Sequence, residues 1–262
     1  MSGFESIRTR REGDVLVVTL NRPERLNAAP PAMFDEIRDA ISSLDGARAV
    51  LIAGEGRAFC SGADLASNAL APGADPGQAT YEALTKHYSP GMLAVAELDV
   101  PVVSAVRGAA AGIGCSLALA ADFTVASETA YFLQAFVNIG LVPDGGASWM
   151  LPRLIGRARA AEMMMLGERV PAAKAFDWGM VHKVVADDVL DAEALELAQR
   201  LAAGPTRALG AMRRNLHAAL DGSYVDALQR EADAQRDMRG TEDSAEGGLA
   251  FLEKRKPAFK GR

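Results

Sequence analysis

Apolar residues along the chain follow two spacings, one typical of strands and the other typical of helices. Short β-branched runs bounded by turn-forming residues predict strands. They cover residues 14–20, 48–53, 100–106, 123–126 and 181–185. Apolar residues that recur every three or four positions predict amphipathic helices from Met33 to Leu44 and from Tyr81 to about Leu98, the second interrupted or started afresh at Pro90.

The remaining segments set the fold class. Residues 66–78 are rich in Ala, Gly, Pro, Asn and Asp, which predicts a mobile loop. Residues 112–121 are apolar on every side, as expected of a helix in the middle of a protein. After about Asp187 the strand pattern stops and helical patterns run to the end. We therefore expect an α/β fold with a core over residues 1–190 and a helical C-terminal segment over residues 191–262.

Composition narrows the class of protein. The 262 residues are 49% hydrophobic and 24% charged, as in soluble globular proteins. The net charge is −6 without a cluster of Lys and Arg, so we expect neither nucleic acid nor an anionic membrane as a partner. No apolar run resembles a signal peptide or a transmembrane helix, which predicts a cytoplasmic protein. Cys60 and Cys115 are too few for a disulfide framework, and we expect both to be small buried hydrophobes.

Several common catalytic patterns find little support. The histidines His87, His182 and His217 lie far apart without a partner at metal-ligand spacing, so we expect no metal. The run from Gly112 to Gly114 lacks the third glycine of a dinucleotide fingerprint. Neither a phosphate-binding loop nor a Gly-x-Ser-x-Gly elbow is present, which disfavours nucleotide and serine-triad chemistry.

Three segments instead fit together as a site. Residues 57–65 form a turn of small residues after a strand, and residues 106–115 lead from a strand into the apolar helix. Residues 139–146 form a glycine-rich turn with a single carboxylate, Asp144. Small residues let a ligand carbonyl approach backbone N–H groups closely. Two such N–H groups from separate turns would stabilise an oxyanion.

These segments occur in an order that resembles the crotonase (enoyl-CoA hydratase/isomerase) family over nearly the whole chain. The resemblance implies a crotonase-like spiral of ββα units with a helical C-terminal segment that forms a trimer or a dimer of trimers. The matching stretches are Asn21–Asn27, Ser61–Asp64, Gly108–Gly114, Leu166–Ala175, Trp178–Val181 and Phe251–Lys260.

The resemblance also implies an acyl-CoA substrate whose thioester oxygen binds the N–H groups of Ala63 and Ile113. Coenzyme A then enters as part of the substrate, and no separate cofactor is expected. Phe259 and Lys260 would cover the CoA of a neighbouring subunit. The other residues expected to contact substrate are Arg25, Leu26, Ala58, Cys60, Ser61, Gly62, Asp64, Leu65, Gly112, Phe136, Leu141 and Trp149.

The reaction depends on which acids and bases are present. Hydratases of this family use two glutamates, and Ser116 and Phe136 occupy the matching positions here, which disfavours water addition. The segment around Asp144 and Trp149 is similar to the ring-1,2-epoxyphenylacetyl-CoA isomerase branch. That likeness implies that Asp144 moves a proton from the α-carbon to the γ-carbon. Apolar neighbours, Phe136, Ile139, Leu141 and Trp149, would raise the pKa of Asp144.

Other interpretations stay open. Pro-Asp-Gly-Gly is also an ordinary turn sequence, and Ser116 suits a hydroxyl that bonds within its own helix. Asp144 could act as a nucleophile, which would give a hydrolase-type or dehalogenase-like reaction. Hydration by an unrecognised base, or a silent acyl-CoA-binding scaffold, are further alternatives.

Overall fold

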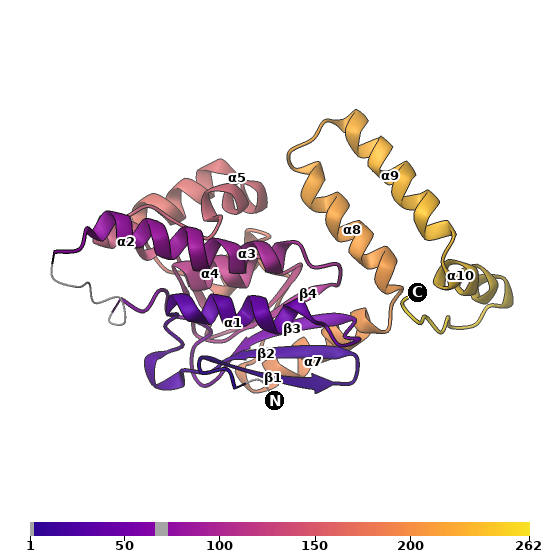
Figure 1. Cartoon of the computed structure of the whole chain (residues 1–262), viewed down its shortest axis with the longest axis horizontal. Helices are drawn as coiled ribbons and strands as arrows, with labels where there is room; N and C mark the ends of the chain where they lie inside the picture. The colour runs from indigo at the N-terminus through magenta and orange to yellow at the C-terminus, as the bar shows by residue number, and fades with distance from the viewer. Residues whose placement is uncertain (1–2, 66–72) are drawn as a thin grey trace.

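The computed structural model describes residues 3–65 and 73–262. Strands and helices alternate through the first two thirds of the chain, and helices alone follow (Figure 1). The strands are β1 (Ile7–Glu12), β2 (Val15–Leu20), β3 (Ala49–Gly54), β4 (Val102–Val106), β5 (Ala109–Ala111), β6 (Phe123–Ser127), β7 (Tyr131–Leu133), β8 (Val170–Pro171) and β9 (Lys183–Val185). The α-helices are α1 (Pro31–Ser42), α2 (Pro76–Ala83), α3 (Ser89–Ala96), α4 (Ile113–Leu119), α5 (Ala147–Leu166), α6 (Ala172–Asp177), α7 (Leu190–Ala202), α8 (Thr206–Ala219), α9 (Tyr224–Arg239) and α10 (Glu242–Glu253). Short 3₁₀ or π turns are η1 (Pro23–Arg25), η2 (Leu84–Tyr88), η3 (Ala135–Ile139) and η4 (Asp187–Val189).

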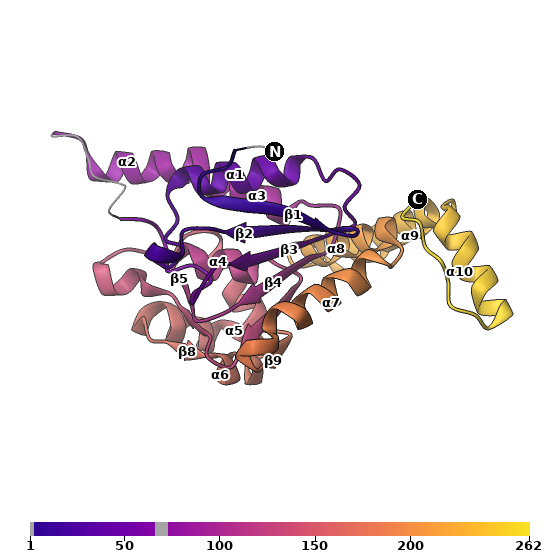
Figure 2. The ribbon, with the colours of Figure 1, turned by 90° about the horizontal axis from the view of Figure 1, so that it is seen from below.

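The larger sheet has the order β1-β2-β3-β4-β6-β9, with β1 antiparallel to β2 and the other pairs parallel. All six residues of β2 are buried, as expected of a strand with helices on both faces. Alternate residues explain the two layers. Leu16 and Val18 pack in the cluster that includes α1, whereas Val15 and Val17 pack against α7 (Figure 2).

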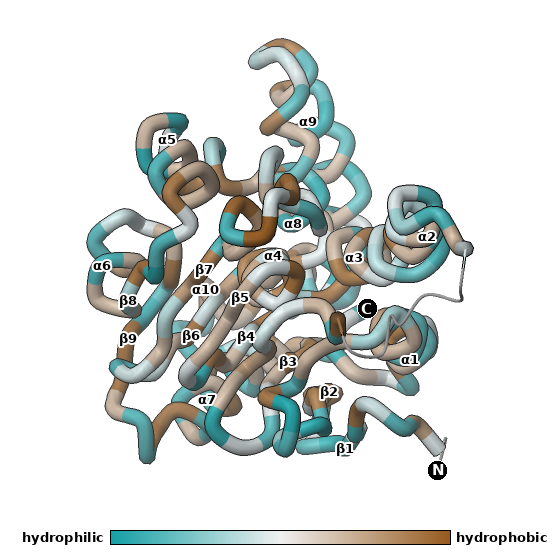
Figure 3. Tube along the Cα trace, turned by 90° about the vertical axis from the view of Figure 1, so that its left-hand side faces the viewer, coloured by the Kyte–Doolittle hydropathy of each residue, from teal (hydrophilic) through white to brown (hydrophobic). Residues whose placement is uncertain are grey.

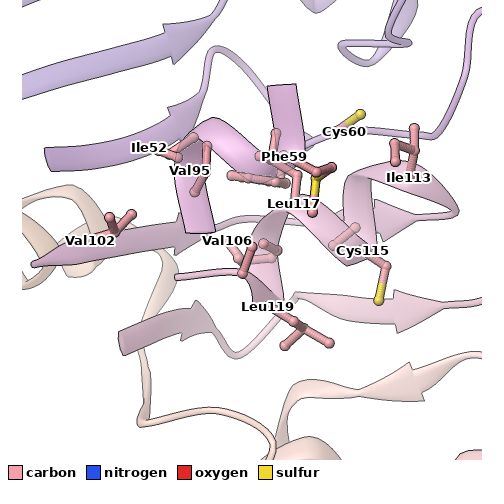
Figure 4. Packing of buried hydrophobic residues seen from close by; sticks show 14 of the residues in the cluster. Ile52, Phe59, Cys60, Val95, Val102, Val106, Ile113, Cys115, Leu117 and Leu119 are labelled. Atoms are coloured by element: carbon pink, nitrogen blue, oxygen red, sulfur yellow. The ribbon is translucent and has the colours of Figure 1, made fainter. Parts of the chain in front are cut away.

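A smaller sheet, β5-β7-β8, leads into α4, and all seven residues of α4 are buried. Cys115 and Leu117 of α4 lie among side chains of the neighbouring strands and loops, including Phe59 and Val106 (Figure 4). The apolar run therefore forms the central helix that its composition predicts, and the α/β fold class is confirmed.

The expected strands are present with shifted ends, whereas the sequence pattern did not predict β1, β5, β7 and β8. The helix expected from Tyr81 continues through Pro90, and its irregular part is the π turn η2 just before that proline. The predicted loop over residues 66–78 is wrong at its end, because Pro76 begins α2 and Asp75 caps it through Gly77 N–H (2.8 Å). The rest of that loop, residues 66–72, lies outside the described residues.

The helices beyond α7 extend away from the core (Figure 1). α7, which the expected boundary at residue 190 places in the C-terminal segment, packs on the larger sheet. α8 is tied to the core by Arg213, whose guanidinium binds Asp122 at 2.8 Å and carbonyls of the α3 end. Among the described helices, none has the length and apolar character needed to cross a membrane.

Candidate active site

The three segments singled out from the sequence meet at one cleft of about 650 Å³. Its lining comes from segments around β5 and α4, which Figure 3 shows between α2 and α5. The lining is largely apolar and comes from the turn after β3, α2, η2, the start of α4, η3 and the turn before α5. Its residues are Ser61, Gly62, Ala63, Leu65, Pro76, Ala79, Thr80, Ala83, Leu84, Tyr88, Gly112, Ile113, Ala135, Phe136, Asn138, Ile139, Leu141 and Asp144.

Two backbone N–H groups line this cleft without a protein acceptor in the described part of the chain. Ala29 forms a parallel bridge with Ala63 that uses the Gly62 carbonyl (2.8 Å) and the Asp64 N–H (2.9 Å). The Ala63 N–H therefore points away from that bridge. Ile113 is the first residue of α4, so its N–H has no partner within the helix. An oxyanion hole requires two such N–H groups directed at one oxygen, so Ala63 and Ile113 stay the predicted donors.

Close packing brings these two turns together. Gly114, one residue into α4, faces Cys60, and a Cβ at Gly114 would lie 2.5 Å from the Cβ of Cys60. Cys60 also pairs with Ala110 of β5 through a parallel bridge. A larger residue at position 114 would therefore push the turn that carries Ala63 away from the start of α4.

Asp144 lies in the turn between η3 and α5 and belongs to the lining of the same cleft. Burial raises the pKa of its carboxyl group from the ordinary 3.8 to about 6. The Oδ1 atom is buried and receives no hydrogen bond from any described residue. Such a carboxylate is a stronger base than an exposed one and stays available to a ligand.

The apolar residues expected around Asp144 divide into two groups. Phe136, Ile139 and Leu141 line the cleft with Asp144. Trp149 is not in that lining, and its expected contact with substrate stays a prediction. Its indole N–H donates to Asp221 at 3.3 Å, and the Arg153 guanidinium stacks on its ring. The helical position of Trp149 in α5 turns the ring toward the α8–α9 connection.

Ser116 takes a different role from the one its helix position suggests. Its hydroxyl donates to the Asp144 carbonyl at 3.0 Å instead of bonding within α4. The sequence contains no signal for this contact, because the two residues are separated by 28 positions.

The other expected substrate residues lie at or behind the cleft. Asp64 is buried and forms an ion pair with Arg22 (2.8 Å), while Arg25 lies 3.8 Å away at the surface. The Leu26 carbonyl accepts from Ser61 N–H, which places Leu26 beside the cleft rim. Ser61, Gly62, Leu65 and Gly112 belong to the lining, whereas Ala58 and Cys60 are buried behind it.

Neither cysteine is suited to nucleophilic chemistry. Burial raises the pKa of the Cys60 thiol to about 11 and that of Cys115 to about 12. Both are fully buried, as the sequence analysis expected. A thiol with so high a pKa is not a thiolate near neutral pH.

Phe259 and Lys260 belong to the last residues before the C-terminus, which Figure 1 shows on the opposite side of the molecule from α2. The Phe259 carbonyl accepts from Arg48 at 3.1 Å, and the Lys260 N–H donates to Asp243 at 2.6 Å. They do not reach the cleft of their own chain, so their contact with the CoA of a neighbouring subunit stays a prediction.

No individual residue of the α2 wall was selected from the sequence, where the predicted loop extended to residue 78. Ala79, Thr80 and Ala83 form this wall. Tyr88 closes its end, with its hydroxyl donating to the Ala29 carbonyl at 2.8 Å. Across residues 3–65 and 73–262, no three His, Cys, Asp or Glu side chains are grouped to hold a metal ion.

Known proteins resemble this chain over its full length. The profile of the enoyl-CoA hydratase/isomerase family matches residues 10–262. A Rhodobacter capsulatus protein named a probable enoyl-CoA hydratase is 40% identical over 99% of both chains. The 1,2-epoxyphenylacetyl-CoA isomerase of Escherichia coli is 38% identical over 99% of this chain and 100% of its own. The solved enoyl-CoA hydratase of Polaromonas sp. JS666 superposes with a TM-score of 0.90 at 34% identity, covering 97% of this chain and 99% of that one.

Proposed function

This chain belongs to the enoyl-CoA hydratase/isomerase family, and on that premise we propose that it moves a double bond within an acyl-CoA thioester, with Asp144 as the acid/base. The observation that carries the proposal is that Asp144 is the one carboxylate in the described lining of the cleft. Addition of water by two carboxylates has no counterpart there, since Ser116 and Phe136 stand at the corresponding positions.

The proposed reaction begins with the thioester oxygen bound to the N–H groups of Ala63 and Ile113. Asp144 removes a proton from the α-carbon of a 3-enoyl-CoA, and the electron pair spreads over the thioester oxygen and the γ-carbon. The same carboxyl group returns the proton at the γ-carbon, which leaves a conjugated 2-enoyl-CoA of unchanged mass. Each N–H group would lower the barrier by about 3–4 kcal/mol, because negative charge develops on the oxygen that it contacts.

The raised pKa of Asp144 supports this role. At about 6, its pKa leaves the carboxyl group largely ionised at neutral pH while making it a stronger base than ordinary aspartate. CoA is part of the substrate, so the proposed reaction needs no separate cofactor. Phe259 and Lys260 are proposed to complete the CoA site of a neighbouring subunit in a trimer.

The test is turnover of a 3-enoyl-CoA, followed by product mass and by the ultraviolet absorbance of the conjugated thioester. We expect unchanged mass with new absorbance. Asp144→Asn should lower kcat by roughly 10²- to 10⁴-fold, because the amide cannot take up the proton, with binding of the CoA ester retained. Gain of one water would indicate a hydratase, and an Asp144→Asn variant with normal turnover would contradict the assignment.

A further inference from the structure

We propose that Ser116 is a positioning residue, which holds the Asp144 turn against the same helical turn that carries the Ile113 N–H. This inference rests on the proposed function of Asp144. It concerns how the base and the oxyanion donors keep their relative positions.

Within the part of the chain that the structure describes, no hydrogen bond or ion pair holds the carboxyl group of Asp144 in place. No described residue donates a hydrogen bond to it, and the buried Oδ1 has no partner. The position of the carboxylate is therefore set by its backbone. Whatever holds that backbone also determines where a proton can be taken up.

Three contacts hold this backbone: a hydrogen bond and a packing contact come from the start of α4, and a second hydrogen bond comes from α5. The Ser116 hydroxyl, which is fully buried, donates to the Asp144 carbonyl at 3.0 Å. That carbonyl also accepts from the Ala147 N–H at 3.1 Å, which begins α5. The next residue, Gly145, packs so closely that a Cβ there would lie 2.4 Å from Ile113 Cδ1 and 2.8 Å from Ser116 Cβ.

The Ile113 N–H and the Ser116 hydroxyl lie three residues apart, within the first turn of α4. One short rigid element thus presents an oxyanion donor to the cleft and fixes the chain segment that carries the base. Proton transfer needs both groups in place at once, so loss of the Ser116 contact should reduce the rate more than it reduces binding.

The chain offers a matched control for the loss of a buried hydroxyl. Ser104 on β4 is also fully buried, and its hydroxyl donates to the Ala118 carbonyl of α4 at 2.7 Å. It lies outside the cleft lining. Ser104→Ala should therefore lower the thermal midpoint as Ser116→Ala does, while leaving turnover near that of the unmodified enzyme.

The experiment compares Ser116→Ala, Ser116→Cys and Ser104→Ala in the full-length enzyme with a 3-enoyl-CoA. Both Ser116 variants should lower kcat by roughly 10- to 100-fold, with little change in KM. The cysteine variant fills the volume with only a weak donor, so its loss of activity separates the hydrogen bond from the cavity. A looser turn admits water, so the acid limb of the kcat profile should move to lower pH.

Parallel measurement of Asp144→Asn keeps the two proposals separate. If Asp144→Asn retains turnover, the proposed function fails and this inference fails with it. If Asp144→Asn is inactive but Ser116→Ala matches Ser104→Ala in kcat and pH profile, only the positioning role is overturned. Full activity in Ser116→Cys would also overturn it, because the hydroxyl donor would then be dispensable.

Discussion

The region around α4 and the C-terminal helices α8–α10 differ in whether their carboxylates are paired and whether their apolar side chains are buried. All residues of α4 are buried. Near this helix, the Oδ1 atom of Asp144 receives no hydrogen bond from a described residue, and burial raises the pKa of the carboxyl group to about 6. In the C-terminal helices, several carboxylates form ion pairs with arginines. The ion pair with Arg255, at 2.6 and 2.9 Å, lowers the pKa of Glu246 to about 2.

The apolar residues also differ between the two regions, because those of α4 are buried and many of those in the C-terminal helices are exposed. α9 has no buried residue, and α8 and α10 expose large apolar side chains, among them Leu216 (69% exposed) and Phe251 (83% exposed). An unpaired carboxylate in an apolar cleft lowers stability and is typical of a functional site. Exposed apolar helix faces are typical of a surface that another protein covers. We therefore place the proposed chemistry in the core and expect the predicted trimer contact in the tail.

The largest effect on stability should come from Arg213, which joins the two regions. Its side chain is 3% exposed and binds Asp122 and the carbonyls of Val95, Ala96 and Leu98. Arg213→Met should lower the free energy of unfolding by about 3–5 kcal/mol, because Asp122 and three carbonyls lose their buried partner. Chemical denaturation measures this loss.

The neighbouring Arg214 is the matched control. Its guanidinium pairs with Asp99 at the surface, with 55% and 70% of the two side chains exposed. Arg214→Met should therefore lower the free energy of unfolding by less than about 1 kcal/mol. Equal losses in the two variants would show that the tail is not joined to the core through Arg213.

The Asp144 carboxyl group should make both activity and stability depend on pH. With an ordinary pKa of 3.8 and a folded value of about 6, the folded chain binds more protons than the unfolded chain between these values. The free energy of unfolding should thus fall as pH rises through that window. Asp144→Asn should be more stable than the unmodified protein above pH 6, by at most about 3 kcal/mol, with the gain lost near pH 4.

Activity should change in the opposite direction, because Asp144 must be ionised to accept a proton. We expect kcat/KM to fall as pH drops below about 6. Denaturation midpoints and initial rates across the same buffers test both trends. A flat rate profile between pH 5 and pH 8 would argue against Asp144 as the base.

A smaller effect should follow from a methyl group at Gly145, where the turn contacts α4. Gly145 has φ of 60°, and its added Cβ would lie 2.4 Å from Ile113 Cδ1. Gly145→Ala should destabilise the fold by about 1–3 kcal/mol and lower kcat more than it raises KM. Gly140→Ala is the control. Gly140 has φ of 72° and its added Cβ would have no neighbouring atom within 4 Å, so this variant has the backbone strain without the steric contact. Equal kcat in the two variants would show that strain alone is responsible.

The smallest effect on the stability of the monomer is expected from substitutions in the C-terminal helices α8–α10. Leu216→Glu replaces an exposed side chain of α8, so the stability of the monomer should change by about 0.5 kcal/mol or less. The same change should dissociate the predicted trimer, which sedimentation equilibrium would detect as a lower mass. An unchanged mass would place the subunit contact elsewhere.

Some strands and helices could be predicted from the sequence, and others could not. β2, β3 and β4 were predictable from their β-branched apolar runs, α1 from its helical spacing, and α4 from being apolar on every side. β5, β7 and β8 have two or three residues each and show none. Their pairing exists because the surrounding chain brings them together, so only the tertiary structure reveals them.

The candidate site divides in the same way. Residue type and order along the chain were sufficient to select Ala63, Ile113 and Asp144, because small residues and a single carboxylate are local features. That the Ser116 hydroxyl binds the Asp144 carbonyl, and that Trp149 turns toward Asp221, depended on tertiary structure. Side-chain direction and hydrogen-bond partners are set by the packing of segments distant in sequence, which local periodicity does not encode.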